Sequence, residues 1–185
     1  IKGTIRRGET IEEDNALAHQ LFHDTKERAE NVMICDLVRN DLSKIAAPGS
    51  VNVPELFGIH RFQSVHQMIS SVECELADGA DMVDIIKATF PMGSMTGAPK
   101  VRTMQIIDDL EGTRRGIYSG SVGCIQPNGD FDLNVVIRSI ASNRRTQRIS
   151  MQVGGAITAL SDPEREYEEC LLKAEAMMET LNGHA

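Results

Sequence analysis

Two pairs of glutamates are the residues of this sequence whose spacing best suits chemistry. Glu166 and Glu169 lie three positions apart in residues 162–180, which are predicted to be helical, so both side chains project from one helix face. Lys173 follows on the same face. Carboxylates one turn apart beside an amine can hold a hard cation and an anionic ligand next to each other. The competing interpretation, which this helix by itself favours, is a solvated acidic face with an ion pair between Glu169 and Lys173.

The second pair, Glu27 and Glu30, has the same spacing in a predicted helix near the start of the chain. One such pair is ordinary, whereas two pairs on helices that adjoin apolar runs are candidates for a shared magnesium site. Mg²⁺ prefers a few carboxylates, keeps several of its waters, and accepts further oxygens from a bound ligand. Two independent, solvated helix faces are the alternative.

His66 and residues 93–100 (GSMTGAPK) are less specific candidates. His66 lies among apolar residues of a predicted strand, where a single histidine is more often a hydrogen-bonded core residue than a proton carrier. Residues 93–100 do not fit a Walker phosphate loop, because the glycine spacing differs and Pro99 lacks a backbone N–H. Their hydroxyls and free N–H groups can still bind an anion, although a tight connection is the favoured interpretation.

Three further positions carry groups that suit an anionic ligand. Arg138 is a charge within a predicted strand, so it must be paired or face a cleft, and its planar guanidinium suits a carboxylate. Tyr118 precedes a glycine at which another backbone can approach closely, although a core tyrosine is equally plausible. Gly154 and Gly155 interrupt a predicted strand and leave N–H groups shortly before the last acidic helix. Lys2, taken alone, indicates only a solvated terminus.

Composition restricts the class of protein. The 185 residues have a net charge of −8 with both signs interspersed, which argues against a nucleic-acid or membrane surface as partner. The four cysteines form no C-x-x-C pair, which is typical of reduced thiols in a cytoplasmic protein. No apolar run approaches the length of a membrane span. The sequence opens on Ile1 without an initiator methionine, so we expect a piece of a longer protein.

The elements that must position these residues alternate between helices and strands. The strong hairpin turn at residues 127–129 (PNG) and the long strand-like runs beside helices predict an α+β fold. The predicted helices are 9–46, 81–90, 100–110 and 162–180; the predicted extended segments are 1–8, short strands within 50–76, 116–125, 130–140 and 148–157; and 92–99 is predicted to be a loop.

Five motifs resemble those of the chorismate-utilising enzymes, in the same order along the chain. This family includes the component I chains of anthranilate synthase and aminodeoxychorismate synthase, and the isochorismate and salicylate synthases. The resemblance implies that residues 1–185 form the C-terminal part of a single chorismate-binding catalytic domain, with stacked antiparallel sheets flanked by helices, as in anthranilate synthase component I. The motifs are 36–42 (DLVRNDL), 93–100 (GSMTGAPK), 116–120 (GIYSG), 136–139 (VIRS) and 161–163 (SDP).

The resemblance also implies a role for each candidate residue. Glu30 and Glu169 would hold Mg²⁺, with Glu27 and Glu166 acting partly through water, and the ion would polarise the departing group of chorismate. The resemblance implies that the catalytic residues are Lys2, His66 and Thr96, of which His66 and Thr96 would lie near the C4 hydroxyl or the ring. It implies that the substrate is bound by Tyr118, Arg138, Gly154, Gly155 and Lys173. One departure is Ala156, because the family's glycine-alanine-glycine turn is Gly154-Gly155-Ala156 here.

Lys2 resembles the lysine of the aminodeoxychorismate synthase branch. The resemblance implies that its neutral amine adds to C2 of chorismate as the C4 hydroxyl leaves, and that ammonia from a glutamine amidotransferase subunit or domain then attacks C4. The product would be 4-amino-4-deoxychorismate, the precursor of p-aminobenzoate and folate. Two alternatives remain. One is anthranilate synthase component I, which aminates C2 and eliminates pyruvate in tryptophan biosynthesis. The other is an inactive fragment that docks the amidotransferase, since the family's upstream proline–glutamate segment is expected to lie outside this sequence.

Overall fold

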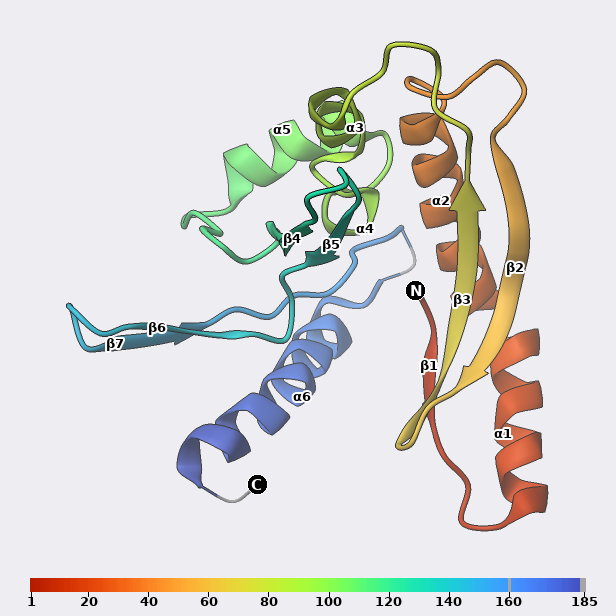
Figure 1. The fold of residues 1–185 in the computed structure, drawn as a ribbon. Helices are drawn as coiled ribbons and strands as arrows, with labels where there is room; N and C mark the ends of the chain where they lie inside the picture. Colours follow the sequence, from red (N-terminus) through yellow and green to blue (C-terminus); the bar gives the residue numbers. More distant parts are fainter. Residues whose placement is uncertain (160, 184–185) are drawn as a thin grey trace. The chain divides into compact units, whose positions relative to one another are not determined.

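The computed structural model describes residues 1–159 and 161–183 and divides into two compact units, Ile1–Asp108 and Asp109–Ala185 (Figure 1). The first unit begins with strand β1 (Thr4–Arg6), helix α1 (Ile11–His23) and helix α2 (Thr25–Leu42). The predicted helix 9–46 is therefore two helices. The break falls at Asp24, whose backbone is extended and whose side chain accepts the N–H of Glu27, so that the residue ending α1 also caps the start of α2.

Strands β2 (Asn52–Arg61) and β3 (Val65–Glu73) join β1 in an antiparallel sheet of order β1-β3-β2. They are longer than the short strands predicted for this segment. His66 pairs with Ile5 on one side and with Arg61 on the other. Alternate residues of β3 point to one face, where His66 contacts α1 and Ser70 contacts α2, so both helices cover the same face of the sheet (Figure 1).

Three helices complete the first unit, and the last of them extends two residues past its boundary. Helix α3 (Met82–Thr89) is preceded by a capping box between Asp81 and Asp84, and α5 (Lys100–Leu110) has the predicted bounds. The predicted loop 92–99 contains a single helical turn, α4 (Gly93–Thr96), which packs on α2.

The second unit contains two antiparallel hairpins and a long helix (Figure 1). The predicted turn joins β4 (Ser121–Ile125) to β5 (Phe131–Val135), and the second hairpin pairs β6 (Ile140–Asn143) with β7 (Arg148–Met151). Helix α6 (Pro163–Asn182) starts at Asp162, whose side chain accepts the N–H of Arg165, and it ends at Gly183 in the left-handed conformation.

Three of the predicted strands were too long, the first because β4 begins only at Ser121. Strand β5 ends at Val135 and β6 begins at Ile140, so Arg138 lies in the connection between them, where its φ is +50°. The interpretation of Arg138 as a charge in the middle of a strand was therefore wrong. Strand β7 ends at Met151, so Gly154 and Gly155 follow the strand rather than interrupting it.

The fold class is confirmed as α+β, with antiparallel sheets and helices. Cys35, Cys74, Cys124 and Cys170 are free thiols in the structure. Within residues 1–159 and 161–183, no helix is both long enough and apolar enough to cross a membrane.

Candidate active site

Lys2, Glu27 and Glu30 form a charged cluster in the first unit. Lys2 Nζ lies 2.8 Å from Oε2 of Glu30, while Lys26 Nζ lies 3.9 Å from the other oxygen of the same carboxylate. Burial, and then the negative charge of Glu30, raise the pKa of Glu27. Gly3 allows this close approach: its φ is +103°, and a Cβ atom there would lie 3.3 Å from Oε2 of Glu27. The structure therefore brings the predicted nucleophile beside two of the predicted metal ligands.

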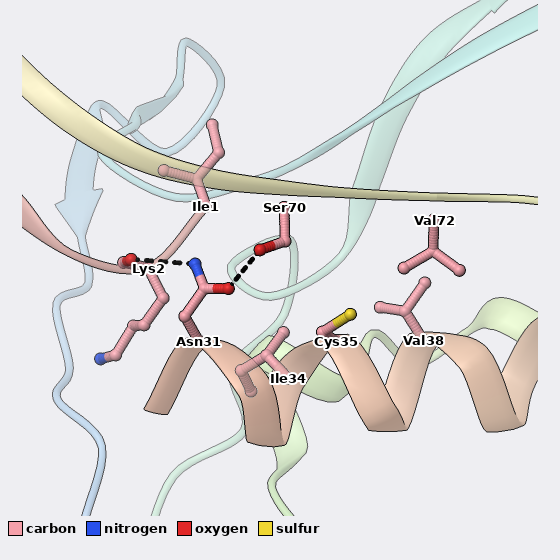
Figure 2. Close-up of a pocket in the computed structure, with 8 residues that line it drawn as sticks. All are labelled: Ile1, Lys2, Asn31, Ile34, Cys35, Val38, Ser70 and Val72. Atoms are coloured by element: carbon pink, nitrogen blue, oxygen red, sulfur yellow. Dashed lines mark hydrogen bonds between the residues drawn. The ribbon is translucent and has the colours of Figure 1, made fainter. Parts of the chain in front are cut away.

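Asn31, which sequence reasoning missed, fixes the backbone of Lys2. Its amide nitrogen donates to the carbonyl oxygens of Lys2, at 3.1 Å, and of Met68, at 3.4 Å. Its amide oxygen accepts the hydroxyl of Ser70 at 2.5 Å. Figure 2 shows this amide reaching from α2 toward Lys2 and Ser70, at one end of a pocket of about 80 Å³ between α2 and β3. The sequence gives no signal for this role beyond the position of Asn31 directly after Glu30.

His66 is fully buried on the helix-covered face of β3. Its Nε2 lies 2.8 Å from Asp14, which also receives two hydrogen bonds from the Arg7 guanidinium and one from the N–H of Gly8. The hydrogen bonds from Arg7, followed by that from Gly8, hold the pKa of Asp14 well below its usual range. Nδ1 of His66 is buried and has no hydrogen-bond partner among the residues that the structure describes.

This environment agrees with the interpretation of His66 as a hydrogen-bonded core residue, because within the first unit it has no surface that a substrate can reach. Its catalytic role stays a prediction. Arg7 and Asp14, which complete the cluster, were not singled out from the sequence, because they are separated from His66 by more than fifty residues.

Thr96 lies at the end of the helical turn α4. Its hydroxyl donates to the carbonyl oxygen of Met92 at 3.2 Å and lies 3.4 Å from that of Gly93. The hydroxyl proton is therefore engaged within the turn, whereas the oxygen keeps its capacity to accept a hydrogen bond.

In the second unit, Tyr118, Gly154, Glu169 and Lys173 lie together. Lys173 Nζ lies 2.5 Å from Oε1 of Glu169 and donates to the carbonyl oxygen of Gly154 at 3.1 Å. A Cβ atom on Gly154 would lie 3.0 Å from the hydroxyl of Tyr118. Burial raises the pKa of Tyr118, so this phenol stays protonated and can donate a hydrogen bond.

Glu166 and Gly155 adjoin this group. A Cβ atom on Gly155 would lie 3.1 Å from Oε2 of Glu166, so the glycine allows this carboxylate to approach the backbone closely. Ser161 donates its hydroxyl to Oε1 of Glu166 at 2.7 Å and accepts the N–H of Thr158 at 3.0 Å. Ser161 belonged to a motif that carried the resemblance, but its contact with Glu166 was not predicted. Arg138, by contrast, is exposed to solvent in the connection between the hairpins.

Comparison with protein families identifies the group to which these residues belong. Residues 1–179 match the family described as chorismate binding enzyme. The protein belongs to this family. All five motifs, and the candidate residues Lys2, Glu30 and Lys173, lie within the matched range.

Relatives within the chorismate-binding family include both of the synthases considered above. The chain is 54% identical over 176 residues to a probable chloroplastic aminodeoxychorismate synthase of Oryza sativa subsp. japonica, covering 95% of this chain and 19% of the relative. It is 48% identical over 181 residues to anthranilate synthase component 1 of Aquifex aeolicus (strain VF5), covering 98% and 36%. The chain thus spans a fifth to little more than a third of these relatives.

The fold agrees with this assignment. The crystal structure of anthranilate synthase component I from Streptococcus pneumoniae TIGR4 matches with a TM-score of 0.78 at 36% identity, covering 95% of this chain and 40% of that one. The chain therefore has part of the α+β fold of that chorismate-binding family member.

In the present chain, two of the predicted metal ligands, Glu27 and Glu30, lie in the first unit, and the other two, Glu166 and Glu169, lie in the second. Among residues 1–159 and 161–183, no cluster of three or more His, Cys, Asp or Glu side chains is suited to a metal ion. Glu27 and Glu30 nevertheless suit a cation by their chemistry, because they are two carboxylates on one face of α2.

Proposed function

We propose that the polypeptide carrying this chain aminates chorismate at C4 to give 4-amino-4-deoxychorismate. The observation that carries the proposal is the position of Lys2, whose amine lies against Glu30 and whose backbone is fixed by Asn31. A lysine held in this way is a suitable nucleophile once its amine is neutral. Membership of the chorismate-binding family and the similarity to the rice relative support the substrate and the reaction.

The reaction proceeds in two displacements. The amine of Lys2 forms a bond to C2, the ring double bonds shift, and the C4 hydroxyl leaves as water after taking up a proton. Ammonia then forms a bond to C4, the double bonds shift back, and the C2–nitrogen bond breaks to release Lys2. Thr96 would lie beside the ring or the departing C4 hydroxyl, where its oxygen can accept a hydrogen bond, and His66 would assist the departure of this group.

The second unit supplies groups for the carboxylates of chorismate. Lys173 and the phenol of Tyr118 are donors beside the Gly154 backbone, and they would orient the substrate. Arg138 is a further proposed contact, because its guanidinium suits a carboxylate.

Magnesium is the proposed cofactor. Glu30 and Glu169 would hold the ion, with Glu27 and Glu166 nearby, because carboxylates are the oxygen ligands it prefers. When bound, Mg²⁺ would supply Lewis-acid polarisation of the substrate. Lys2 and Lys173, which pair with these same carboxylates, would become available to the substrate.

A glutamine amidotransferase, as a subunit or domain, is the proposed source of ammonia, and the pathway would be folate synthesis in the cytoplasm. Anthranilate synthesis is the second candidate, because the chain is 48% identical to the Aquifex anthranilate synthase component 1. The two reactions differ in the carbon that is aminated and in the loss of pyruvate.

The test is product identification by mass with Mg²⁺, chorismate and ammonium, on the polypeptide that carries this chain. We expect 4-amino-4-deoxychorismate from the unmodified protein and its loss in Lys2→Ala. Lys26→Ala, which removes the more distant lysine from Glu30, is the matched control and should retain the product. Formation of anthranilate by the unmodified protein would refute the proposal in favour of the second candidate.

A further inference from the structure

A second cluster of lysines and a carboxylate lies in the first unit, away from Lys2. Asp41, in the last turn of α2, is almost fully buried, and each of its oxygens pairs with a different lysine. Lys44 Nζ lies 3.0 Å from Oδ1, and Lys100 Nζ makes a short contact with Oδ2. The two lysines differ in surroundings, because the side chain of Lys44 is 51% exposed and that of Lys100 only 14%.

Lys100 connects α2 to residues 93–99. It is the first residue of α5 and directly follows this segment. The other end of the segment also rests on α2, since a Cβ atom on Gly93 would lie 2.9 Å from the Cβ atom of Leu37. Leu37 and Asp41 are one helical turn apart, so the same face of α2 holds both ends of the segment.

Hydrogen bonds within the segment set its shape, and both of its ends contact α2. Gly97 donates its N–H to the carbonyl oxygen of Gly93, and the Thr96 hydroxyl donates to that of Met92. These bonds close a single turn, which could still move as a unit. The buried pair of Lys100 with α2 is directional, because its hydrogen bond joins two charged groups.

We propose that Asp41 is a positioning residue for chorismate conversion: through Lys100 it fixes residues 93–99 so that Thr96 and the loop N–H groups meet the substrate. This inference rests on the proposed function, which puts Thr96 beside the reacting part of chorismate. A displacement of about 1 Å among groups that contact the substrate lowers a rate by roughly 100-fold. Loss of Lys100 also leaves the buried carboxylate with only its exposed partner.

The experiment compares Lys100→Met with Lys44→Met. Both variants remove a lysine from Asp41, but only Lys100→Met removes the ion pair that joins residues 93–99 to α2. Hydrogen–deuterium exchange of amides 93–99 and steady-state kinetics with chorismate are measured on the whole polypeptide. For Lys100→Met we expect exchange to accelerate about tenfold and kcat to fall by roughly 100-fold, with a smaller change in KM. Lys44→Met should change both by less than about twofold, as is typical for an exposed ion pair.

Two further variants keep the test decisive. Lys100→Arg keeps the charge, so its kcat should be higher than that of Lys100→Met. If Lys100→Met does not fold, the apolar pair Asp41→Leu with Lys100→Met removes the buried charges and should fold, because such replacements are often neutral for stability.

Equal effects of Lys100→Met and Lys44→Met, or unchanged exchange of residues 93–99, would overturn the inference. A loss of thermal stability with kcat intact would overturn it as well, because Asp41 would then be only structural. Failure of the unmodified protein to convert chorismate would instead refute the proposed function, while the exchange measurement would still decide whether Asp41 holds the segment.

Discussion

Replacement of Lys2 by methionine should strengthen the binding of Mg²⁺ in the absence of chorismate. The amine of Lys2 lies 2.8 Å from Oε2 of Glu30, and Glu30 is a proposed magnesium ligand. The ion must therefore displace this amine before it can use that oxygen. Methionine keeps much of the length of the side chain and removes the competing charge.

The structure sets the size of this effect. The side chain of Lys2 is 30% exposed and that of Glu30 only 11%, so their interaction is partly shielded from water. A hydrogen bond to a charged group contributes about 1.5–3 kcal/mol. Removing this competition should therefore lower the dissociation constant for Mg²⁺ by about 10- to 100-fold, at 1.4 kcal/mol for each factor of ten.

Lys26→Met is the control, because Lys26 Nζ lies 3.9 Å from the same carboxylate and its side chain is 63% exposed. Such a pair contributes about 0–1 kcal/mol, so its removal should change the affinity by less than about fivefold. Isothermal titration with Mg²⁺ at fixed ionic strength measures both variants. If Lys2→Met bound Mg²⁺ no more tightly than Lys26→Met, the reasoning that Lys2 and the ion compete for Glu30 would be wrong.

Three other predictions concern individual contacts. Hydrogen bonds from Arg7 hold the pKa of Asp14 below its ordinary value, so the ionised carboxylate stabilises the fold above about pH 4, and this stabilisation is lost as the pH falls further. In urea unfolding, the difference in free energy of unfolding between wild type and Asp14→Asn should therefore shrink from pH 6 to pH 2. Gly93→Ala should lower the free energy of unfolding by about 1–3 kcal/mol because its Cβ atom would overlap α2, whereas Gly112→Ala, which meets nothing within 4 Å, should not. Gly154→Ala should lower the melting temperature, and Tyr118→Phe should partly restore it by removing the hydroxyl 3.0 Å from the added methyl group; no recovery in the double variant would contradict the contact.

Local signals in the sequence were sufficient for much of the secondary structure. The turn at 127–129 and helix α5 were predicted correctly, because a Pro-Asn-Gly turn and helical periodicity act over a few neighbouring residues. The C-terminal end of β5 was not predicted, because the chain leaves the strand after Val135 and Arg138 adopts a left-handed backbone. A residue type that rarely adopts positive φ gives no sign of such a bend.

The environment of His66 illustrates the limit for the site. An alternating strand has two faces, and the sequence of β3 does not say which face the helices cover. That choice decides whether His66 is exposed or packed against Asp14. The sheet order β1-β3-β2 and the position of α1 determine which face of β3 is covered, and both depend on contacts between residues far apart in the chain.

The sequence by itself determined the spacing of both glutamate pairs, the motifs and the family they indicate, because spacing along a helix and order along a chain are one-dimensional properties. Only the tertiary structure placed Lys2 against Glu30, Asn31 against the Lys2 backbone, and Lys100 against Asp41. These contacts join residues separated by about thirty to sixty positions, and they form because the strands and helices that carry them bury their apolar faces together.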